Sequence, residues 1–177
     1  MPRLLTVLGL LAICMGSTST SSCTGFFGTG SGNGNDDDLS FVAQLQLQDA
    51  NGDITDTFDR GETIVFVLTV RNRLDTSATA EFTTTRTSDF VVLRENTADV
   101  VWQWSDGRSF SDVATTIEFA PGETRTFTET WDQILSNGTQ LRSGTYEARG
   151  VLVFSGFDSD PLRSNQMGST LERFTVR

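Results

Sequence analysis

From residue 39 to the C-terminus, the chain consists of short runs in which apolar and polar residues alternate. In the run 41–48, Val42 and three glutamines separate the apolar positions Phe41, Ala43, Leu45 and Leu47, the period-two pattern of a strand with one buried face. The next run, 64–70, is apolar on both faces and predicts a central strand. No segment keeps a helical period for three turns, and we expect at most one short helical turn, at 131–137.

Turn-forming dipeptides separate further runs of the same kind. These runs are 78–85, 89–94, 99–105, 115–119, 125–131, 145–154 and 171–176, and many are rich in Thr, Val and Phe, which suit a pleated sheet. The dipeptides favour tight turns; they are Asn51-Gly52, Arg60-Gly61, Asp106-Gly107, Pro121-Gly122, Asn137-Gly138 and Ser143-Gly144. About seven to nine short strands between such turns predict an all-β, antiparallel, immunoglobulin-like β-sandwich over 39–177, with a barrel as the alternative.

The residue types that the chain lacks exclude most catalytic chemistry. It has no His, its 13 basic residues are all Arg, and both Cys lie within the first 23 residues. A His base, a Lys Schiff base, a Cys nucleophile in the domain and zinc held by His or Cys are therefore excluded. We expect a protein that is not an enzyme, with no catalytic residues, no cofactor and no metal.

The charge narrows the class of partner. The formal net charge is −10 at pH 7, whereas nucleic acids and anionic lipid surfaces bind basic patches. We therefore expect a protein partner, no nucleic acid, and membrane contact through a lipid anchor only.

The first 38 residues have the composition of a targeting segment and a tether. Arg3 precedes an apolar run at 4–15, and small residues continue to Cys23, as in a signal peptide over 1–23. The sequence before Cys23 resembles a bacterial lipoprotein processing site, so Cys23 is the predicted lipidation site; a plain secretory signal is the alternative. Residues 24–38, rich in Gly, Ser, Asn and Asp, suit a flexible tether. We expect an exported, membrane-anchored lipoprotein of the cell envelope, or a secreted protein if Cys23 is not lipidated.

Between about residues 62 and 154, a series of motifs occurs in a distinctive order. The motifs are Val70-Arg71-Asn72, Ser88-Asp89-Phe90-Val91-Val92, Val101-Trp102-Gln103-Trp104-Ser105-Asp106-Gly107, Phe110, Ala120-Pro121-Gly122-Glu123, Glu129-Thr130-Trp131-Asp132 and Ser143-Gly144-Thr145-Tyr146. In this order and spacing they resemble the BsuPI family, which is named for an intracellular proteinase inhibitor. The resemblance implies a small immunoglobulin-like domain that inhibits a serine protease of the subtilisin type.

Trp102 and Trp104 lie two residues apart in the run 99–105 and are expected to share one face with Val100. Aromatic side chains on a strand most often pack in the core. The alternative is an exposed pair at a binding edge, where Trp and Arg are typical anchors. In that case Asp106 and Arg108 of the following turn would add polar contacts, and we retain all four as candidate binding residues.

The segment 156–169 is the longest stretch without a strand pattern. Loops on a rigid sandwich often carry binding, and an inhibitor loop binds best when it is pre-organised. Leu162 and Met167 are candidates to enter the pocket of a subtilisin-type protease. The alternative is a hairpin excursion without function.

Acidic residues give weaker signals. Four aspartates between 49 and 59 hint at a loose calcium site, but Ile54 and Arg60 occupy positions where an EF-hand needs Gly and Glu. A solvated β-turn is the favoured interpretation. Paired carboxylates such as Asp158 and Asp160 are typical of a surface rather than of a hydrolase site.

The sequence therefore favours non-catalytic protein binding, with inhibition of a subtilisin-type serine protease as its concrete form. The competing class is a structural or protein-interaction module of the cell envelope without inhibitory activity, because a fold does not fix a function. A carboxylate-based hydrolase is the least favoured class.

Overall fold

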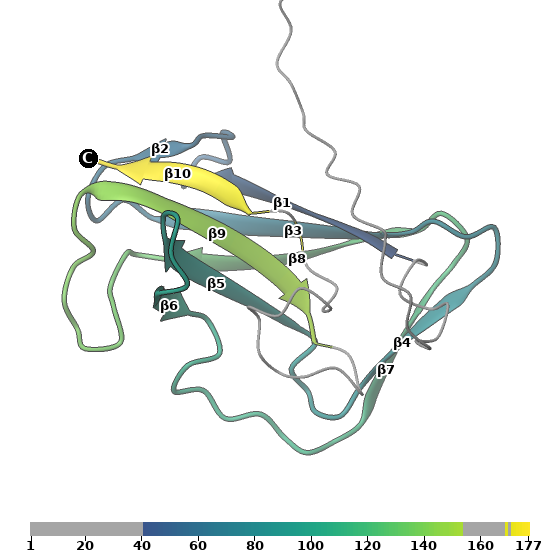
Figure 1. The fold of residues 1–177 in the computed structure, drawn as a ribbon. Helices are drawn as coiled ribbons and strands as arrows, with labels where there is room; N and C mark the ends of the chain where they lie inside the picture. The colour runs from purple at the N-terminus through teal and green to yellow at the C-terminus, as the bar shows by residue number, and fades with distance from the viewer. Residues whose placement is uncertain (1–40, 154–168, 170) are drawn as a thin grey trace, which may run out of the picture. The chain divides into compact units, whose positions relative to one another are not determined.

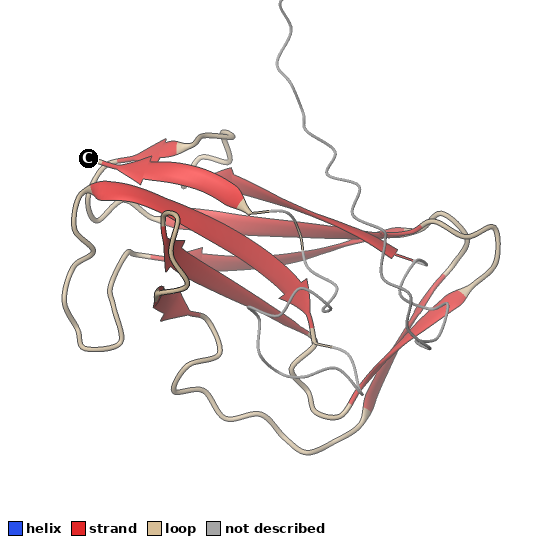
Figure 2. Ribbon diagram, viewed as in Figure 1, coloured by secondary structure: helices blue, strands red, loops and turns tan. Residues whose placement is uncertain are grey.

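The computed structural model describes residues 41–153, 169 and 171–177, and within them every regular element is a strand (Figure 2). No helix that could cross a membrane occurs in this part of the chain. The strands are β1 (Phe41–Gln48), β2 (Thr57–Phe58), β3 (Ile64–Asn72), β4 (Ala78–Phe82), β5 (Ser88–Arg94), β6 (Val100–Gln103), β7 (Thr115–Phe119), β8 (Thr124–Trp131), β9 (Gly144–Leu152) and β10 (Glu172–Val176).

The strands form two larger sheets and one separate pair (Figure 1). One sheet has the order β1-β3-β8, the other has the order β2-β10-β9-β5-β6, and β4 pairs with β7 alone. Neighbouring strands run antiparallel, except that β2 runs parallel to β10. The two larger sheets pack face to face as the predicted β-sandwich, and they do not close into the alternative barrel.

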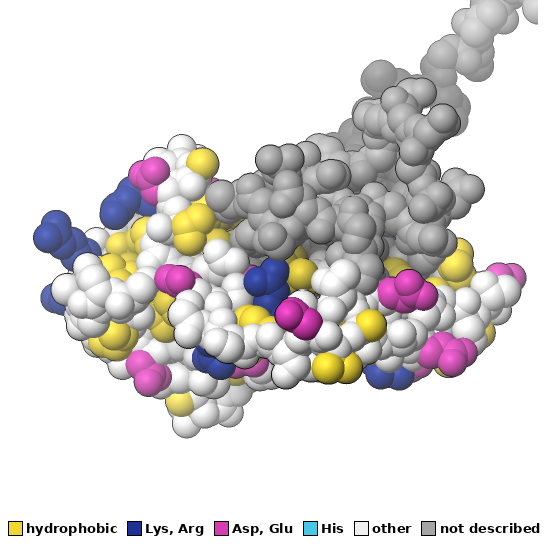
Figure 3. Space-filling view, turned by 90° about the horizontal axis from the view of Figure 1, so that it is seen from below, with side chains coloured by type: hydrophobic (Ala, Val, Ile, Leu, Met, Phe, Trp, Pro, Cys, Tyr) yellow, Lys and Arg dark blue, Asp and Glu magenta, His cyan; other side chains and the backbone are white. Residues whose placement is uncertain are grey.

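The core lies between these two sheets and follows the period-two pattern of the sequence. Along the central strand β3, Ile64, Phe66, Leu68 and Val70 are fully buried, and the residues between them are half-buried. On the outer surface, by contrast, acidic, basic and apolar side chains are interspersed over the face drawn in Figure 3. Phe66 reaches across the sandwich to Phe90 of β5, with 5.7 Å between ring centroids. Each fully buried side chain of this size stabilises the fold by about 1.5–3 kcal/mol.

The structure corrects one local prediction, the helical turn at 131–137. After β8 the chain instead forms a small loop in which Ile134 and Gln140 make an isolated antiparallel bridge. Gln133 explains the difference, because its φ of 60° lies in the left-handed region and leaves the helical path. Its side chain is fully buried, so the loop is anchored to the domain rather than continued as a helix.

The turn before β8 forms as its sequence predicts. Gly122 has a φ of 68°, and Glu123 N donates to Ala120 O at 3.0 Å, as in a type II turn that needs Gly at its third position. The fully buried side chain of Asn72 holds the same turn from below, since its Nδ2 donates to the carbonyl oxygens of Phe119 and Ala120 at 3.2 and 3.1 Å.

Tyr146 fastens the start of β9. Its side chain is buried, and its hydroxyl donates to Arg142 O at 2.8 Å, the contact of a tyrosine corner in immunoglobulin-like sandwiches. We expect Tyr146→Phe to lower the free energy of unfolding by about 1 kcal/mol, because the ring remains and only one hydrogen bond is lost. Urea denaturation measures this as a lower midpoint at unchanged slope. A midpoint equal to that of the wild type would contradict the role assigned to this hydroxyl.

Candidate functional site

Four of the candidate binding residues lie on β6 and in the turn that follows it. Asp106 N donates to Gln103 O at 3.2 Å, and Arg108 N donates to Ser105 O at 3.1 Å, so residues 104–108 form a closed turn, here called the Trp104 turn. Gly107 has a φ of 70°, in agreement with the predicted Asp-Gly turn chemistry. Asp106 and Arg108 are exposed at the tip, where a partner can reach them.

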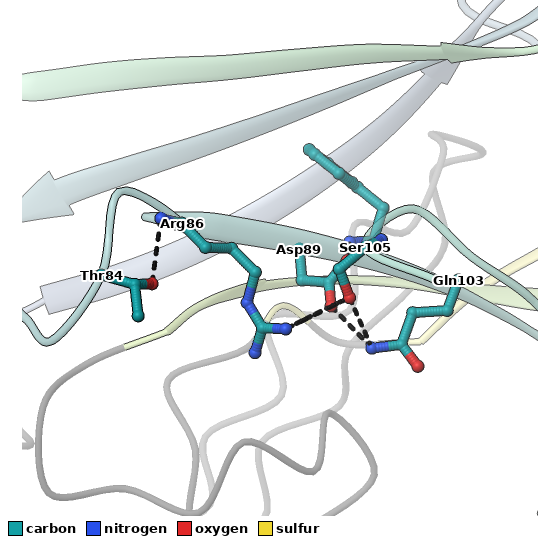
Figure 4. Close-up of polar contacts among 6 residues, drawn as sticks. Thr84, Arg86, Asp89, Gln103 and Ser105 are labelled. Carbon is teal, nitrogen blue, oxygen red and sulfur yellow. Dashed lines mark hydrogen bonds and ion pairs between the residues drawn. The ribbon is translucent and has the colours of Figure 1, made fainter. Parts of the chain in front are cut away.

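Asp89 of β5 anchors the Trp104 turn from within the domain (Figure 4). Its side chain is fully buried. The carboxylate accepts hydrogen bonds from Ser105 N at 3.1 Å, Ser105 Oγ at 2.7 Å and Gln103 Nε2 at 2.7 Å. It also accepts one from Phe90 N at 2.9 Å, and Arg86 NH1 lies 3.9 Å away. A buried carboxylate requires such compensation, and the compensating donors fix the backbone of the turn.

Aromatic and guanidinium groups stack beside this anchor. The Trp104 and Phe110 ring centroids are 5.5 Å apart. The Arg108 guanidinium lies 4.5 Å from the Trp104 ring, and that of Arg86 lies 5.8 Å from the Phe110 ring. Both distances are within the range of cation–π attraction. The Trp104 turn therefore presents a Trp–Arg pair in one fixed arrangement, the residue types that dominate binding energy at protein interfaces.

The indole of Trp104 has an unusual feature. Its Nε1 is buried and has no hydrogen-bond acceptor in the part of the chain that the structure describes. A buried donor without an acceptor destabilises a protein by about 1–3 kcal/mol. The ring is nevertheless held by Phe110 and Arg108 on one side, and it is partly buried against the core.

Trp102 has a different environment from Trp104. Its ring stacks between Phe66 at 5.4 Å and Trp131 at 4.8 Å, with interplanar angles of 17° and 18°. Trp102 therefore packs against the core, as strand aromatics most often do, and a binding role for it stays a prediction.

The predicted face shared with Val100 does not extend along the whole strand. The pairing of β5 with β6 shifts between Val92 and Leu93, and Val100 is 42% exposed. A β-bulge of this kind offsets the side-chain alternation on one side of the irregularity. The bulge therefore removes Val100 from the face on which Trp102 packs.

The acidic segment at 49–53 forms a turn that uses its own carboxylate. Asp49 accepts hydrogen bonds from Asp53 N at 2.9 Å, Asn51 N at 2.9 Å and Asn51 Nδ2 at 3.2 Å. The backbone hydrogen bond from Asp53 is the main reason that the pKa of Asp49 lies below its ordinary value. This is the geometry of an Asx turn, and within the described residues no three acidic side chains gather as a metal site would require.

The remaining candidates, Cys23, Leu162 and Met167, lie outside the described residues. The structure also draws attention to Asp89, Arg86 and Phe110, which sequence reasoning did not select as site residues. Asp89 carried one usable signal, because it is the single acidic residue of β5 and directly precedes four apolar residues, and a charged residue in such a strand needs a buried partner.

Several solved structures share parts of this fold at low identity. The C-terminal domain of Wzt aligns with a TM-score of 0.46 and 13% identity over 76% of this chain and 73% of its own. The CARDB domain of a Pyrococcus furiosus protein aligns with a TM-score of 0.40 and 12% identity, over 77% of this chain and 94% of the CARDB chain. A β-glucosidase from Erythrobacter marinus aligns with a TM-score of 0.42 and 12% identity over 78% of this chain. The aligned part is only 15% of the glucosidase chain.

Two comparisons address the sequence itself. No curated protein sequence matches the chain. The family model described as BsuPI, intracellular proteinase inhibitor, matches residues 54–156, a range that contains β3 to β9 and the whole Trp104 turn. It also covers each of the motif segments from Val70 to Tyr146. The chain therefore belongs to the BsuPI family of intracellular proteinase inhibitors.

Proposed function

We propose that this domain inhibits a serine protease of the subtilisin type and that it does so outside the cell, held at a membrane. Membership of a proteinase inhibitor family is the observation that carries the proposal. A protease is thus the expected partner, and binding rather than catalysis is the expected activity. The subtilisin type follows from the resemblance of the motifs to the founding inhibitor.

The Trp104 turn is the part of the described surface that best suits this role. Two hydrogen bonds from Ser105 to Asp89 fix its shape before any partner binds, and one from Gln103 holds the end of β6 to the same carboxylate. Such pre-organisation lowers the entropy cost of association. Trp104 and Arg108 supply an aromatic and a guanidinium contact at its edge. The segment 156–169, with Leu162 and Met167, remains the second candidate for direct contact with the protease.

The location proposed for the domain rests on the N-terminal sequence. Residues 1–23 have the pattern of a signal peptide that ends at Cys23, and residues 24–38 have the composition of a tether. A lipid on Cys23 would hold the domain at the membrane of the cell envelope, while the tether would let it reach a protease. If the protein is processed without lipidation, the same domain would be secreted.

Titration of residues 36–177 against a subtilisin-type protease tests the function. This fragment contains all ten strands and every core residue. We expect a sharp stoichiometric loss of protease activity while the domain stays intact. Arg108→Ala should weaken inhibition by about tenfold if the Trp104 turn is the contact, and Arg73→Ala, an exposed arginine in the loop after β3, is the matched control.

Two results would change the proposal. If Leu162→Ala with Met167→Ala weakens inhibition and Arg108→Ala does not, the contact belongs to the segment 156–169. If protease activity is unaffected at any ratio, inhibition of this protease type is refuted. The interaction module of the cell envelope then becomes the better explanation, and capture of an envelope protein without any effect on proteolysis would support it.

A further inference from the structure

A pocket of about 290 Å³ opens where the chain passes from β8 to β9. Arg94, the last residue of β5, and Arg142, just before β9, both line it. Val101 and Leu135 contribute apolar surface. Tyr146 also lines the pocket and links its two sides, because it is the register partner of Arg94 and donates to Arg142 O. The pocket thus combines two cationic residues with an apolar wall.

The walls of this pocket are held in place by hydrogen bonds of the domain itself. In the loop after β8, Leu135 N donates to Thr139 O at 2.9 Å, and Leu141 N donates to Gln133 O at 2.8 Å. The buried Gln133 Nε2 in turn donates to Asp59 O at 2.8 Å. The pocket therefore exists before any ligand arrives, which is typical of sites for small groups.

The charge inside the pocket is opposite to that of the protein. The chain has a net charge of −10, yet the lining residues include two arginines and no Asp or Glu. Both arginines are exposed, so they lie at the mouth of the pocket. Within the described residues neither guanidinium takes part in an ion pair or hydrogen bond, whereas Arg125, Arg173 and Arg177 each pair with a carboxylate. Two unpaired arginines beside one pocket form a site for an anionic group.

The pocket dimensions and its apolar wall indicate which anion fits. A volume of about 290 Å³ is at the lower end of ligand sites, so it suits one or two amino-acid residues rather than a folded surface. Guanidinium groups bind carboxylates through directed, charge-assisted hydrogen bonds. Val101 and Leu135 suit an apolar side chain next to that carboxylate, and an inorganic anion would leave this wall unused.

We propose that this pocket binds the free C-terminal carboxylate of a peptide or protein chain whose last side chain is apolar. Arg94 and Arg142 bind the carboxylate, and Val101 and Leu135 contact the terminal side chain. The site is separate from the Trp104 turn, because that turn is anchored at the start of β5 and Arg94 ends the strand. This binding activity goes beyond protease inhibition and does not depend on it.

Fluorescence anisotropy with a matched pair of peptides tests the proposal. The full 177-residue chain, kept in non-ionic detergent, is titrated into a fluorescein-labelled pentapeptide that ends in leucine, either as the free acid or as the amide. We expect saturable binding of the acid and at least about tenfold weaker binding of the amide, since the amide lacks the charge. Inorganic phosphate should not displace the acid peptide at the concentration that the peptide needs for saturation.

Variants assign the binding to the pocket. Arg94→Gln and Arg142→Gln should each weaken binding of the acid peptide by about tenfold. Arg73→Gln removes the same charge from the loop that follows β3. That loop begins at the opposite end of β3 from Ile64, and the partner of Ile64, Trp131, precedes the pocket loop. Arg73→Gln should therefore leave binding unchanged. Equal melting temperatures of the three variants would show that their folds are intact.

Any one of four results would overturn the proposal. These are no saturable binding of the acid peptide up to about 1 mM, equal binding of acid and amide, displacement by phosphate, or pocket variants that bind as Arg73→Gln does. If the two sites are independent, Arg94→Gln and Arg142→Gln will lose peptide binding but will inhibit the protease as the wild type does. The failure of this proposal is therefore distinguishable from the failure of the inhibitor assignment.

Discussion

Replacing Asp89 with alanine is expected to lower the free energy of unfolding by about 3 kcal/mol or more. The substitution removes a fully buried carboxylate that accepts hydrogen bonds from Ser105 N, Ser105 Oγ and Gln103 Nε2. These donors would lose their acceptor at a site with little access to water, and Arg86 would lose its acidic neighbour. Urea denaturation of residues 36–177 measures the loss.

A nearby acidic residue provides the control for this variant. Asp106 lies in the same turn but is exposed, and Asp106→Ala should change stability by no more than about 0.5 kcal/mol. Asp89→Asn keeps the size of the side chain but turns one acceptor into a donor that faces other donors, so it should also be clearly destabilised. If Asp89→Ala proves as stable as Asp106→Ala, the stabilising role of the buried carboxylate is refuted.

Asp89→Asn also distinguishes a local loosening of the Trp104 turn from a loss of stability of the whole domain. If the hydrogen bonds to Asp89 hold the Trp104 turn, amide exchange at Ser105 should accelerate in Asp89→Asn even under conditions where the domain stays folded. A turn that retains its protection while overall stability falls would mean that Asp89 supports β5 alone. That result would remove the argument that the turn is pre-organised for a partner.

The strand pattern of this domain could be predicted from the sequence because it is a local signal. The run 41–48 coincides with β1, and the apolar run that predicts a central strand lies within β3, between β1 and β8. The strand missed was β2, which has two residues and pairs in parallel with the C-terminal β10. Two residues are too few to show a period, and only the distant partner makes them a strand.

The buried polar residues could not be predicted in the same way. Asn72 and Gln133 are both fully buried, and each is satisfied by backbone groups far away in the sequence, such as Ala120 O for Asn72 and Glu62 O for Gln133. Sequence periodicity shows which face of a strand is apolar, but it does not show that a polar residue at its end closes a remote turn. Such contacts depend on the completed fold.

These contacts explain what the family motifs describe. Asp89 of one motif accepts side-chain hydrogen bonds from Gln103 and Ser105 of another. The motif with Asn72 bonds to the one at 120–123, and Tyr146 closes its own corner. The residues that carry the family resemblance thus hold strands and turns together. Family membership therefore specifies the scaffold in detail, whereas the contact that we propose with a protease would depend on exposed residues such as Arg108.

Replacing Trp102 with alanine is expected to lower the free energy of unfolding by about 3–5 kcal/mol, the range for a large aromatic residue removed from a core. Its ring fills the space between Phe66 and Trp131, which belong to neighbouring strands of the opposite sheet. The cavity left behind would remove the packing contact between the two sheets at this point. Thermal unfolding followed by near-ultraviolet circular dichroism, which reports aromatic packing, would show the loss.

Trp104→Ala is the matched comparison and distinguishes packing from binding at this edge. Trp104 is only partly buried against the core, its ring contacts Phe110 and Arg108, and its buried Nε1 lacks an acceptor in the described part of the chain. Its removal should therefore destabilise the domain much less than removal of Trp102 and should weaken protease binding more. Trp102→Ala with nearly wild-type stability and lost inhibition would reverse these roles and make Trp102 the binding residue. Trp102→Phe, which keeps a ring between the two sheets, should recover most of the stability.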